Sequence, residues 1–568
     1  MAIPRDGPRL SSILLWTLLA GLCLLGMDRP LWPGGEARQA EIGREMTLRP
    51  TMVPRFNGEL VLDLPPLYAW LAASSFALAG SFTPASMRIV SALAAFLLLL
   101  LTYRLASAAG LRELAGRAAF LMATSLTLLG AGHWIGPTAL EGLCGALALS
   151  ALWHFVRGPS PRRAALLTAS LVLTFWCSGV AGLWVTAGAG ILLHSRPTGD
   201  KREHPVRLLV TATLFAITGC APWFLATWPT ASPSQRTTLL MGLPAGRSLW
   251  PLSGMGLDLL ILSSMAVPWL VPIVSLGRPA FWRRVVARNS ELSELAVLSA
   301  GAFGALLLWP GGRPGLVLAL APFVFLLVAA ATRELVGPDP PWVAALPSSL
   351  ALPLLDFPAL LAVAAPALAI LWSRSLWPSY ALMLGLGALA SAGGLASARA
   401  GRWRNLWDLQ RMGAALFCMA VLVSLVPLLN LSRDPTPAIR WLQDEVPPGQ
   451  AVGIAAGEQD LRGWVSFLGE RTVVPLVEPI QGNAPSIGWV LEHAGPGYRY
   501  TDLRRFGFEM QARAAFAATG GLSLWKRRGD SHASRLAPAG LRRNPRRGTL
   551  SMVGTMTDFS GAMWGWYP

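Results

Sequence analysis

Residues 87–106 read MRIVSALAAFLLLLLTYRLA, and this stretch determines the expected fold of the chain. A helix rises about 1.5 Å per residue, so the stretch is long enough to cross a hydrocarbon core of about 30 Å. Strands of a membrane barrel would be about half as long and would alternate apolar with polar residues. The stretch therefore predicts a transmembrane helix.

Similar apolar stretches recur along most of the chain. Of its 568 residues, 53% are hydrophobic and only 14% are charged, and the mean hydropathy is +0.48. In a typical soluble domain, about a quarter of the residues are charged. We expect about thirteen transmembrane helices, with a shorter apolar stretch over 65–80 lying at the membrane interface. The expected cores are 10–27, 87–106, 115–130, 138–155, 164–176, 180–194, 206–228, 257–276, 295–309, 315–332, 353–372, 378–396 and 412–429.

The placement of Lys and Arg predicts the orientation. With the amino terminus in the cytoplasm, the even-numbered loops become the basic ones, as cytoplasmic loops usually are. The net charge of +17 is then explained by topology and anionic lipids, and nucleic-acid binding is not expected. We favour a retained anchor over a cleaved signal peptide for Leu10–Met27, since Asp28-Arg29-Pro30 follows in place of small residues.

Two polar regions interrupt the apolar pattern, and an odd helix count places both outside the cytoplasm. The first is a mixed-charge loop over 28–85. The second begins near Asn430, where AVGIAA and TVVPLV (451–456 and 472–477) resemble short strands. The predicted fold is an all-α polytopic membrane bundle over 1–430 with a small α/β extracytoplasmic domain over 431–528. Residues 529–568 form a basic tail that we expect to be disordered.

Cysteine and histidine give no sign of a metal site. The five cysteines fall inside or beside apolar stretches, no CxxC pair occurs, and the six histidines are scattered. We therefore expect the cysteines to be packing residues, and neither a metal nor a cofactor is predicted.

The first polar loop carries a family resemblance. GEARQAEIGREM (35–46) looks like the first-loop signature of membrane glycosyltransferases of the C fold, above all the aminoarabinose transferases of lipid A and the protein O-mannosyltransferases. VPRFNG (53–58), followed by DLPPL (63–67), is similar to a second motif of these enzymes. WPGGR (309–313) and VSFLGER (465–471) resemble later parts of the same family, so the likeness extends along nearly the whole chain.

The resemblance implies an enzyme that transfers a hexose or pentose from a polyprenyl-phosphate donor. The acceptor would be a lipid, polysaccharide or protein of the cell envelope, reached from the inner (plasma) membrane. The lipid-linked donor is a substrate, so no cofactor is implied. An arginine can hold its phosphate bidentately, and a carboxylate can accept the proton of the acceptor hydroxyl.

Several family positions differ in this chain. Gly35 stands where the family carries its catalytic Asp, and Leu64 stands where it carries a Lys. Thr138 replaces a second Asp, although Glu141 follows one helical turn later.

The candidate site follows from the matching positions and the chemistry of the reaction. Two carboxylates are predicted to be catalytic, and four further residues are predicted to bind substrate. The catalytic pair is Glu36 and Glu141, and the substrate-binding set is Arg38, Arg55, Asp63 and Arg313. The alternative for Glu141 is a structural role, as a buried acid neutralised by a neighbour such as His133 or an Arg. The alternative for Glu36 is a place on a solvated helix that ion pairs stabilise.

Two other functions remain open. A catalytically impaired homologue would use the same groove as a lipid-sugar binding or scaffold protein, and the replacement of both Asp residues favours it. A transporter or flippase is the third reading. The sequence shows no matched pair of broken helices of the kind that inverted repeats would give.

Overall fold

The computed structural model describes most of the chain. The described residues are 9–63, 65–194, 206–233, 235–236, 255–286, 289–309, 313–335, 356–373, 378–400, 403–476, 487–493, 503–516 and 519–528. They separate into two compact units. The membrane unit comprises Met1–Arg29, Met46–Arg55 and Leu60–Leu429, and the small unit comprises Pro30–Glu45, Phe56–Glu59 and Asn430–Pro568.

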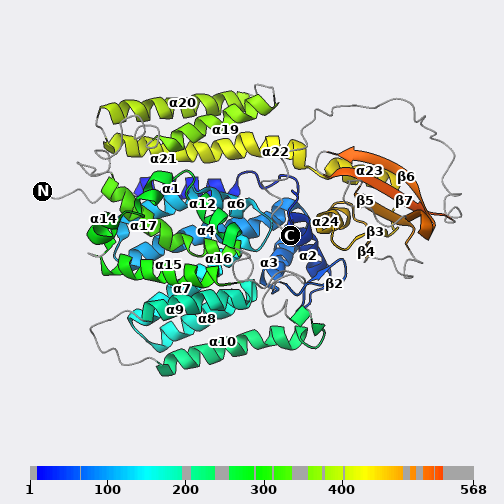
Figure 1. The fold of residues 1–568 in the computed structure, drawn as a ribbon, viewed down its shortest axis with the longest axis horizontal. Coiled ribbons are helices and arrows are strands. Elements are labelled where there is room, and N and C mark those ends of the chain that lie inside the picture. Colours follow the sequence, from blue (N-terminus) through cyan, green and yellow to red (C-terminus); the bar gives the residue numbers. More distant parts are fainter. Residues whose placement is uncertain are drawn as a thin grey trace. The chain divides into compact units, whose positions relative to one another are not determined.

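The membrane unit consists mainly of helices (Figure 1). Its first half contains α1 (Arg9–Leu24), α3 (Leu67–Ala79), α4 (Pro84–Ala108), α5 (Arg112–Ala123), α6 (Leu126–His133), α7 (Thr138–Arg157), α8 (Pro161–Ser178), α9 (Val180–His194) and α10 (Val206–Thr227). Its second half contains α12 (Met255–Met265), α13 (Leu270–Ser275), α14 (Pro279–Phe281), a π-helix (Trp282–Val286), α15 (Ser290–Leu307), α16 (Pro314–Leu318), α17 (Ala321–Leu335), α19 (Phe357–Ser373), α20 (Pro378–Arg399), α21 (Trp403–Ala420), a second π-helix (Val421–Leu425) and α22 (Val426–Arg433).

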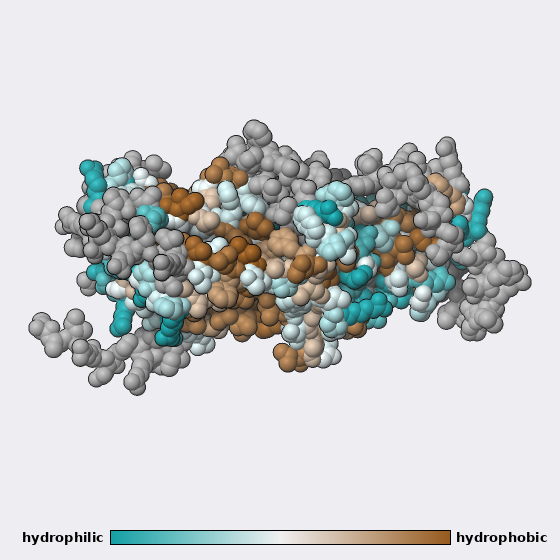
Figure 2. All heavy atoms as spheres, turned by 90° about the horizontal axis from the view of Figure 1, so that it is seen from below, coloured by the Kyte–Doolittle hydropathy of each residue, from teal (hydrophilic) through white to brown (hydrophobic). Residues whose placement is uncertain are grey.

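The helices have the length and composition of membrane spans. Among the described residues, seven helical segments are long and apolar enough to cross a bilayer, and α5 with α6, bent by 64°, would make an eighth. Large apolar side chains remain exposed on the outer helices, including Leu78, Ile191 and Leu225, and Figure 2 shows such side chains gathered over one face. This surface suits contact with lipid. The polytopic fold is confirmed, while the number thirteen stays a prediction.

Small residues let the membrane helices pack closely. A Cβ added at Gly188 of α9 would lie 2.4 Å from the Cβ of Ala305 on α15. One added at Gly413 of α21 would lie 2.8 Å from the backbone of Ala359 on α19. Glycine at such points allows two helix backbones to approach, as is common in membrane bundles. Figure 1 shows α19, α20 and α21 running side by side.

The small unit is an α/β domain that also includes two pieces of the first polar loop. Its elements are α2 (Glu36–Leu48), β1 (Arg55–Phe56), β2 (Glu59–Leu60), α23 (Thr436–Glu445), β3 (Val452–Ala455), α24 (Gln459–Phe467), β4 (Val473–Leu476), β5 (Trp489–His493), a 3₁₀ turn (Leu503–Phe506), β6 (Phe508–Phe516) and β7 (Gly520–Arg527). The last residues of α2 and the outer residues of the β1–β2 hairpin belong to the membrane unit.

A five-stranded sheet with the order β4-β3-β5-β7-β6 forms the core of the small unit. The β3 strand pairs in parallel with both β4 and β5, and β7 pairs antiparallel with β5 and β6. Helix α24 makes the crossover from β3 to β4, as parallel strands require. The predicted strands within 451–456 and 472–477 are therefore β3 and β4. The predicted disordered tail, 529–568, lies outside the described residues.

Candidate functional site

The amino end of α2 is held by a carboxylate from α24. Gly34 and Gly35 precede α2 with φ angles of 105° and 99°, a conformation that glycine adopts without steric cost. Their N–H groups donate to Asp460 Oδ2 at 2.7 Å and to Asp460 Oδ1 at 2.8 Å. The pKa of Asp460 is raised, mainly because burial disfavours the charged carboxylate; the two N–H bonds oppose this rise.

Glu36 begins α2 and points inward. Its side chain is fully buried, and its Oε2 accepts a hydrogen bond from the N–H of Trp32 at 2.9 Å. The residue therefore closes the turn that leads into the helix. Arg38, two residues later, is half-buried, and its guanidinium lies 6.0 Å from the centre of the Phe56 ring.

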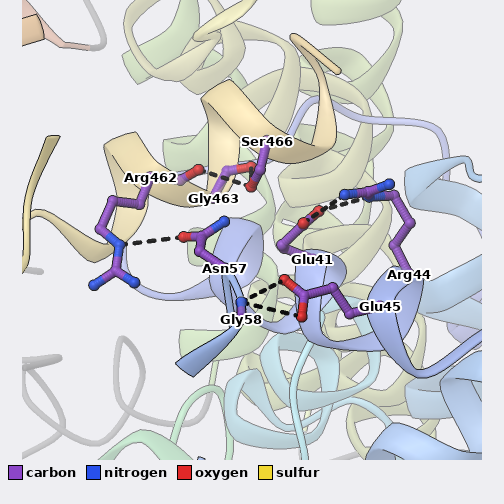
Figure 3. A network of polar contacts seen from close by, with 8 residues as sticks. All are labelled: Glu41, Arg44, Glu45, Asn57, Gly58, Arg462, Gly463 and Ser466. Atoms are coloured by element: carbon purple, nitrogen blue, oxygen red, sulfur yellow. Dashed lines mark hydrogen bonds and ion pairs between the residues drawn. The ribbon is translucent and has the colours of Figure 1, made fainter. Parts of the chain in front are cut away.

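Helices α2 and α24 pack closely against one another (Figure 3). A Cβ added at Gly463 of α24 would lie 2.5 Å from the carbonyl carbon of Ala37, so only glycine fits there. Nearby, Glu41 is buried and accepts two hydrogen bonds from Arg44, at 2.6 and 2.7 Å. Burial raises the pKa of Glu41, an effect that the Arg44 hydrogen bond and charge reduce. With Glu36 and Glu41 both buried, α2 is not a solvated helix.

Arg462 holds the turn between β1 and β2. Its Nε donates to Asn57 Oδ1 at 3.2 Å, and its Nη2 donates to Glu59 Oε2 at 2.7 Å. Its guanidinium lies 4.6 Å from the centre of the Phe56 ring, and its side chain is only 3% exposed. Figure 3 shows Arg462 and Gly463 on α24, facing Asn57 and α2 respectively. One short helix thus contacts both loop segments of the small unit.

The membrane unit brings two predicted site residues together. Arg313 Nη1 lies 3.9 Å from Glu141 Oε1, and both side chains are buried. The N–H of Arg313 donates to Asp258 Oδ1 at 3.0 Å. A Cβ at Gly315 would lie 2.3 Å from Glu141 Oε2, so glycine leaves room for this carboxylate. The partner of Glu141 is thus Arg313, whereas the ring of His133 contacts backbone oxygens.

The remaining predicted residues of the membrane unit lie nearer the surface. Arg55 is exposed at the start of β1, and Asp63 is half-buried. Leu64 and the loop over 310–312 lie outside the described residues. The structure therefore unites Glu141 with Arg313 in one unit and Glu36 with Arg38 in the other. The functional roles of all six residues stay predictions.

Several wholly or partly buried charged residues do not stand out among the predicted site residues. No sequence motif marks Asp460 or Arg462, because the C-terminal motif that resembles the family begins at residue 465. Arg88 on α4 does carry a signal, since a charge inside an apolar stretch by default suggests function. It is fully buried, donates to the carbonyl of Met27 at 2.8 Å and also contacts the carbonyl of Arg29.

Known structures resemble this chain over nearly its full length. A crystal structure of ArnT from Cupriavidus metallidurans bound to undecaprenyl phosphate matches with a TM-score of 0.64 at 15% identity, covering 90% of this chain and 98% of that one. The apo structure of the same protein matches with a TM-score of 0.63 at 16% identity, covering 91% and 98%. The chain has the C-type glycosyltransferase fold.

A sequence-family match agrees with the C fold. Residues 63–225 match the model of the dolichyl-phosphate-mannose-protein mannosyltransferase family. No curated protein sequence matches the chain. The expected similarity to aminoarabinose transferases and O-mannosyltransferases is therefore confirmed. Within the described residues, no group of three or more His, Cys, Asp or Glu side chains is arranged to hold a metal ion.

Proposed function

We propose that this membrane protein transfers a sugar from a polyprenyl-phosphate donor to an acceptor outside the cytoplasm. The observation that carries the proposal is the similarity to the ArnT structure, whose bound ligand is undecaprenyl phosphate. The family match over 63–225 names a second enzyme class with a polyprenyl-phosphate donor. No cofactor is needed in this scheme, since the phosphate is the leaving group of the donor.

Arg313 is the residue that we propose for the donor phosphate in the membrane unit. A phosphate leaving group carries charge at the membrane surface, and a guanidinium can meet two of its oxygens at once. Arg313 is already oriented by Glu141 and by the backbone bond to Asp258. At 3.9 Å the ion pair with Glu141 is long, so a phosphate could compete for the guanidinium. Glu141 then acts by positioning the arginine.

The amino end of α2, in the small unit, carries a separate group of predicted site residues. Arg38 is a further candidate for phosphate binding there, and Arg55 and Asp63 are candidates for binding at the surface of the membrane unit. A carboxylate at this end of α2, for which the sequence nominates Glu36, would serve as general base. The acceptor hydroxyl loses its proton as it attacks the sugar, and a base in contact with it speeds that step by about 10²–10⁴-fold.

A binding assay followed by a turnover assay tests the proposal. The purified protein is given undecaprenyl phosphate, and then a panel of undecaprenyl-phosphate hexoses and pentoses with envelope lipids as acceptors. The proposal predicts binding of undecaprenyl phosphate and its release from at least one donor. Arg313→Gln should weaken binding, while the exposed control Arg440→Gln should not.

The competing function is a catalytically impaired homologue that binds lipid-linked sugars. Gly35 and Thr138, which replace the Asp residues of the family, favour this function. Binding of undecaprenyl phosphate without turnover of any donor would support it and contradict the transferase. Movement of a donor across proteoliposomes without a covalent product would instead support a flippase.

A further inference from the structure

Four carboxylates of the small unit lie on α2 or contact the residues just before it. One of them, Glu45, lies away from the amino end of α2 and accepts the N–H of Gly58. The other three differ in accessibility. Glu36 is fully buried and accepts the Trp32 N–H, and Glu41 is 1% exposed and paired with Arg44. Asp460 is half-buried, and so are Gly34 and Gly35, which it contacts. A base must reach the proton that it removes, so accessibility separates Asp460 from the other two.

Space is open beside Gly35, whose N–H contacts this carboxylate. A Cβ built at Gly35 would meet no atom within 4 Å. Gly35 N donates to Asp460 Oδ1 at 2.8 Å, so the open space adjoins a residue that touches the carboxylate. The absence of a side chain at Gly35 therefore leaves open space on a residue that is itself in contact with Asp460.

The surroundings of Asp460 also suit proton transfer. Its two backbone hydrogen bonds fix the carboxylate in place, while each oxygen has a second lone pair. Burial raises its pKa, and the negative charges of Glu36 and Glu458 raise it further. A carboxylate with a raised pKa is a stronger base than an ordinary aspartate.

We propose that Asp460 of α24, and not Glu36, is the general base at the amino end of α2. The inference rests on the proposed glycosyl transfer. Asp460 takes the proton of the acceptor hydroxyl while the acceptor oxygen bonds to the anomeric carbon of the sugar. The bond from that carbon to the phosphate oxygen breaks, and the polyprenyl phosphate leaves with the bonding electrons. Water then removes the proton from Asp460.

Four variants of the full-length protein test this assignment: Asp460→Asn, Asp460→Glu, Glu36→Gln and Asp444→Asn. Asp444 is an exposed aspartate of the same unit and serves as the matched control. The rate at which undecaprenyl phosphate is released from a donor that the protein uses gives kcat. Measuring this rate at several pH values gives the pH profile of kcat. The Kd for undecaprenyl phosphate and the melting temperature report on binding and folding separately.

The assignment predicts a loss of kcat in Asp460→Asn of about 100-fold or more, with Kd changed less than about threefold. In the unsubstituted protein kcat should rise with pH as Asp460 ionises, and this limb should be missing from the residual activity of Asp460→Asn. Asp460→Glu should recover part of the activity, and its kcat should rise with pH over a different pH range from that of the unsubstituted protein. Asp444→Asn should leave kcat unchanged. Glu36→Gln should lose less kcat than Asp460→Asn and should keep the rise of kcat with pH.

Two results would overturn the assignment while leaving the transferase intact. One is full kcat in Asp460→Asn; the other is a loss of kcat that is matched by equal losses in Kd and melting temperature, as a purely structural role would give. A different result, no turnover of any donor by the unsubstituted protein, would overturn the proposed function and this assignment with it.

Discussion

Arg462 and Glu59 lie 403 residues apart in the sequence, yet Arg462 Nη2 donates to Glu59 Oε2 at 2.7 Å. The same guanidinium also donates to Asn57 and to the carbonyl of Ala456. The turn of the first loop is therefore fixed by the α24 segment of the C-terminal region. This makes the order of the loop depend on a residue far from it in the chain.

Replacing Arg462 should release this turn. Arg462→Gln removes charge-assisted hydrogen bonds from a buried position, and we expect the loss of about 2 kcal/mol of unfolding free energy in the small unit. Hydrogen exchange at the amides of Asn57 and Gly58 should become faster. Arg440→Gln, an exposed arginine on α23, is the control and should change neither. Unchanged exchange in Arg462→Gln would show that the turn does not depend on this side chain.

Gly463 makes a sharper steric test of the packing of α2 against α24. In Gly463→Ala the new methyl carbon would lie 2.5 Å from the carbonyl carbon of Ala37 and 2.7 Å from the N of Arg38, so backbone must move. Overpacking of this kind costs about 1–3 kcal/mol, which a thermal melt can detect. Gly457→Ala, whose Cβ would meet nothing within 4 Å, should melt like the unsubstituted protein. Equal melting of both variants would contradict the close packing.

The buried Arg313 and Glu141 should act as a pair in donor binding. Arg313→Gln leaves the Glu141 carboxylate without its ion-pair partner. Glu141→Gln removes one of the groups that position the arginine and leaves Asp258 in place. We therefore expect Arg313→Gln to weaken undecaprenyl phosphate binding at least about tenfold, since a charge-assisted bond contributes about 1.5–3 kcal/mol. Glu141→Gln should weaken it less. The double variant should resemble Arg313→Gln; additive effects of the two substitutions would show that the residues act independently.

The sequence predicts the helices of this protein better than the contacts between its side chains. Continuous apolar runs predict the helices such as α4 and α7, because burial in lipid demands them. In α2 the spacing of three and four residues puts Arg38, Glu41 and Glu45 on one helix face. This spacing does not reveal that Glu41 pairs with Arg44 or that Glu45 accepts the N–H of Gly58. Contacts such as that of Asp460 with Gly35 join residues 425 positions apart, and no local pattern encodes them.

The small unit should lose stability as the pH rises through the pKa of His493. Its Nδ1 lies 2.9 Å from Glu458 Oε2. Burial lowers the pKa of His493, but the hydrogen bond and charge of Glu458 raise it above 6.5 in total. A folded-state pKa above the unfolded one means that the protonated pair stabilises the fold fully below about pH 6.5. That stabilisation is lost as the pH rises past the folded-state pKa.

Unfolding of the small unit, followed between pH 6 and pH 9, measures this dependence. The unfolding free energy of the unsubstituted protein should decline as the pH rises through this range. In His493→Gln this decline should be absent. His154, on α7 of the membrane unit, offers His154→Gln as the control that should keep the decline. If the unfolding free energy of His493→Gln still declines over this pH range, another titrating group causes the decline.

Transfer of sugar from the lipid donor can be followed directly with a radiolabelled sugar carried on undecaprenyl phosphate. The protein in lipid vesicles is mixed with this donor and with envelope lipids, and the lipid phosphate and the sugar are separated and counted. We predict that undecaprenyl phosphate and sugar-labelled acceptor appear in equal amounts. Donor that binds to the protein and stays intact, with no labelled product for any sugar of the panel, would contradict this prediction.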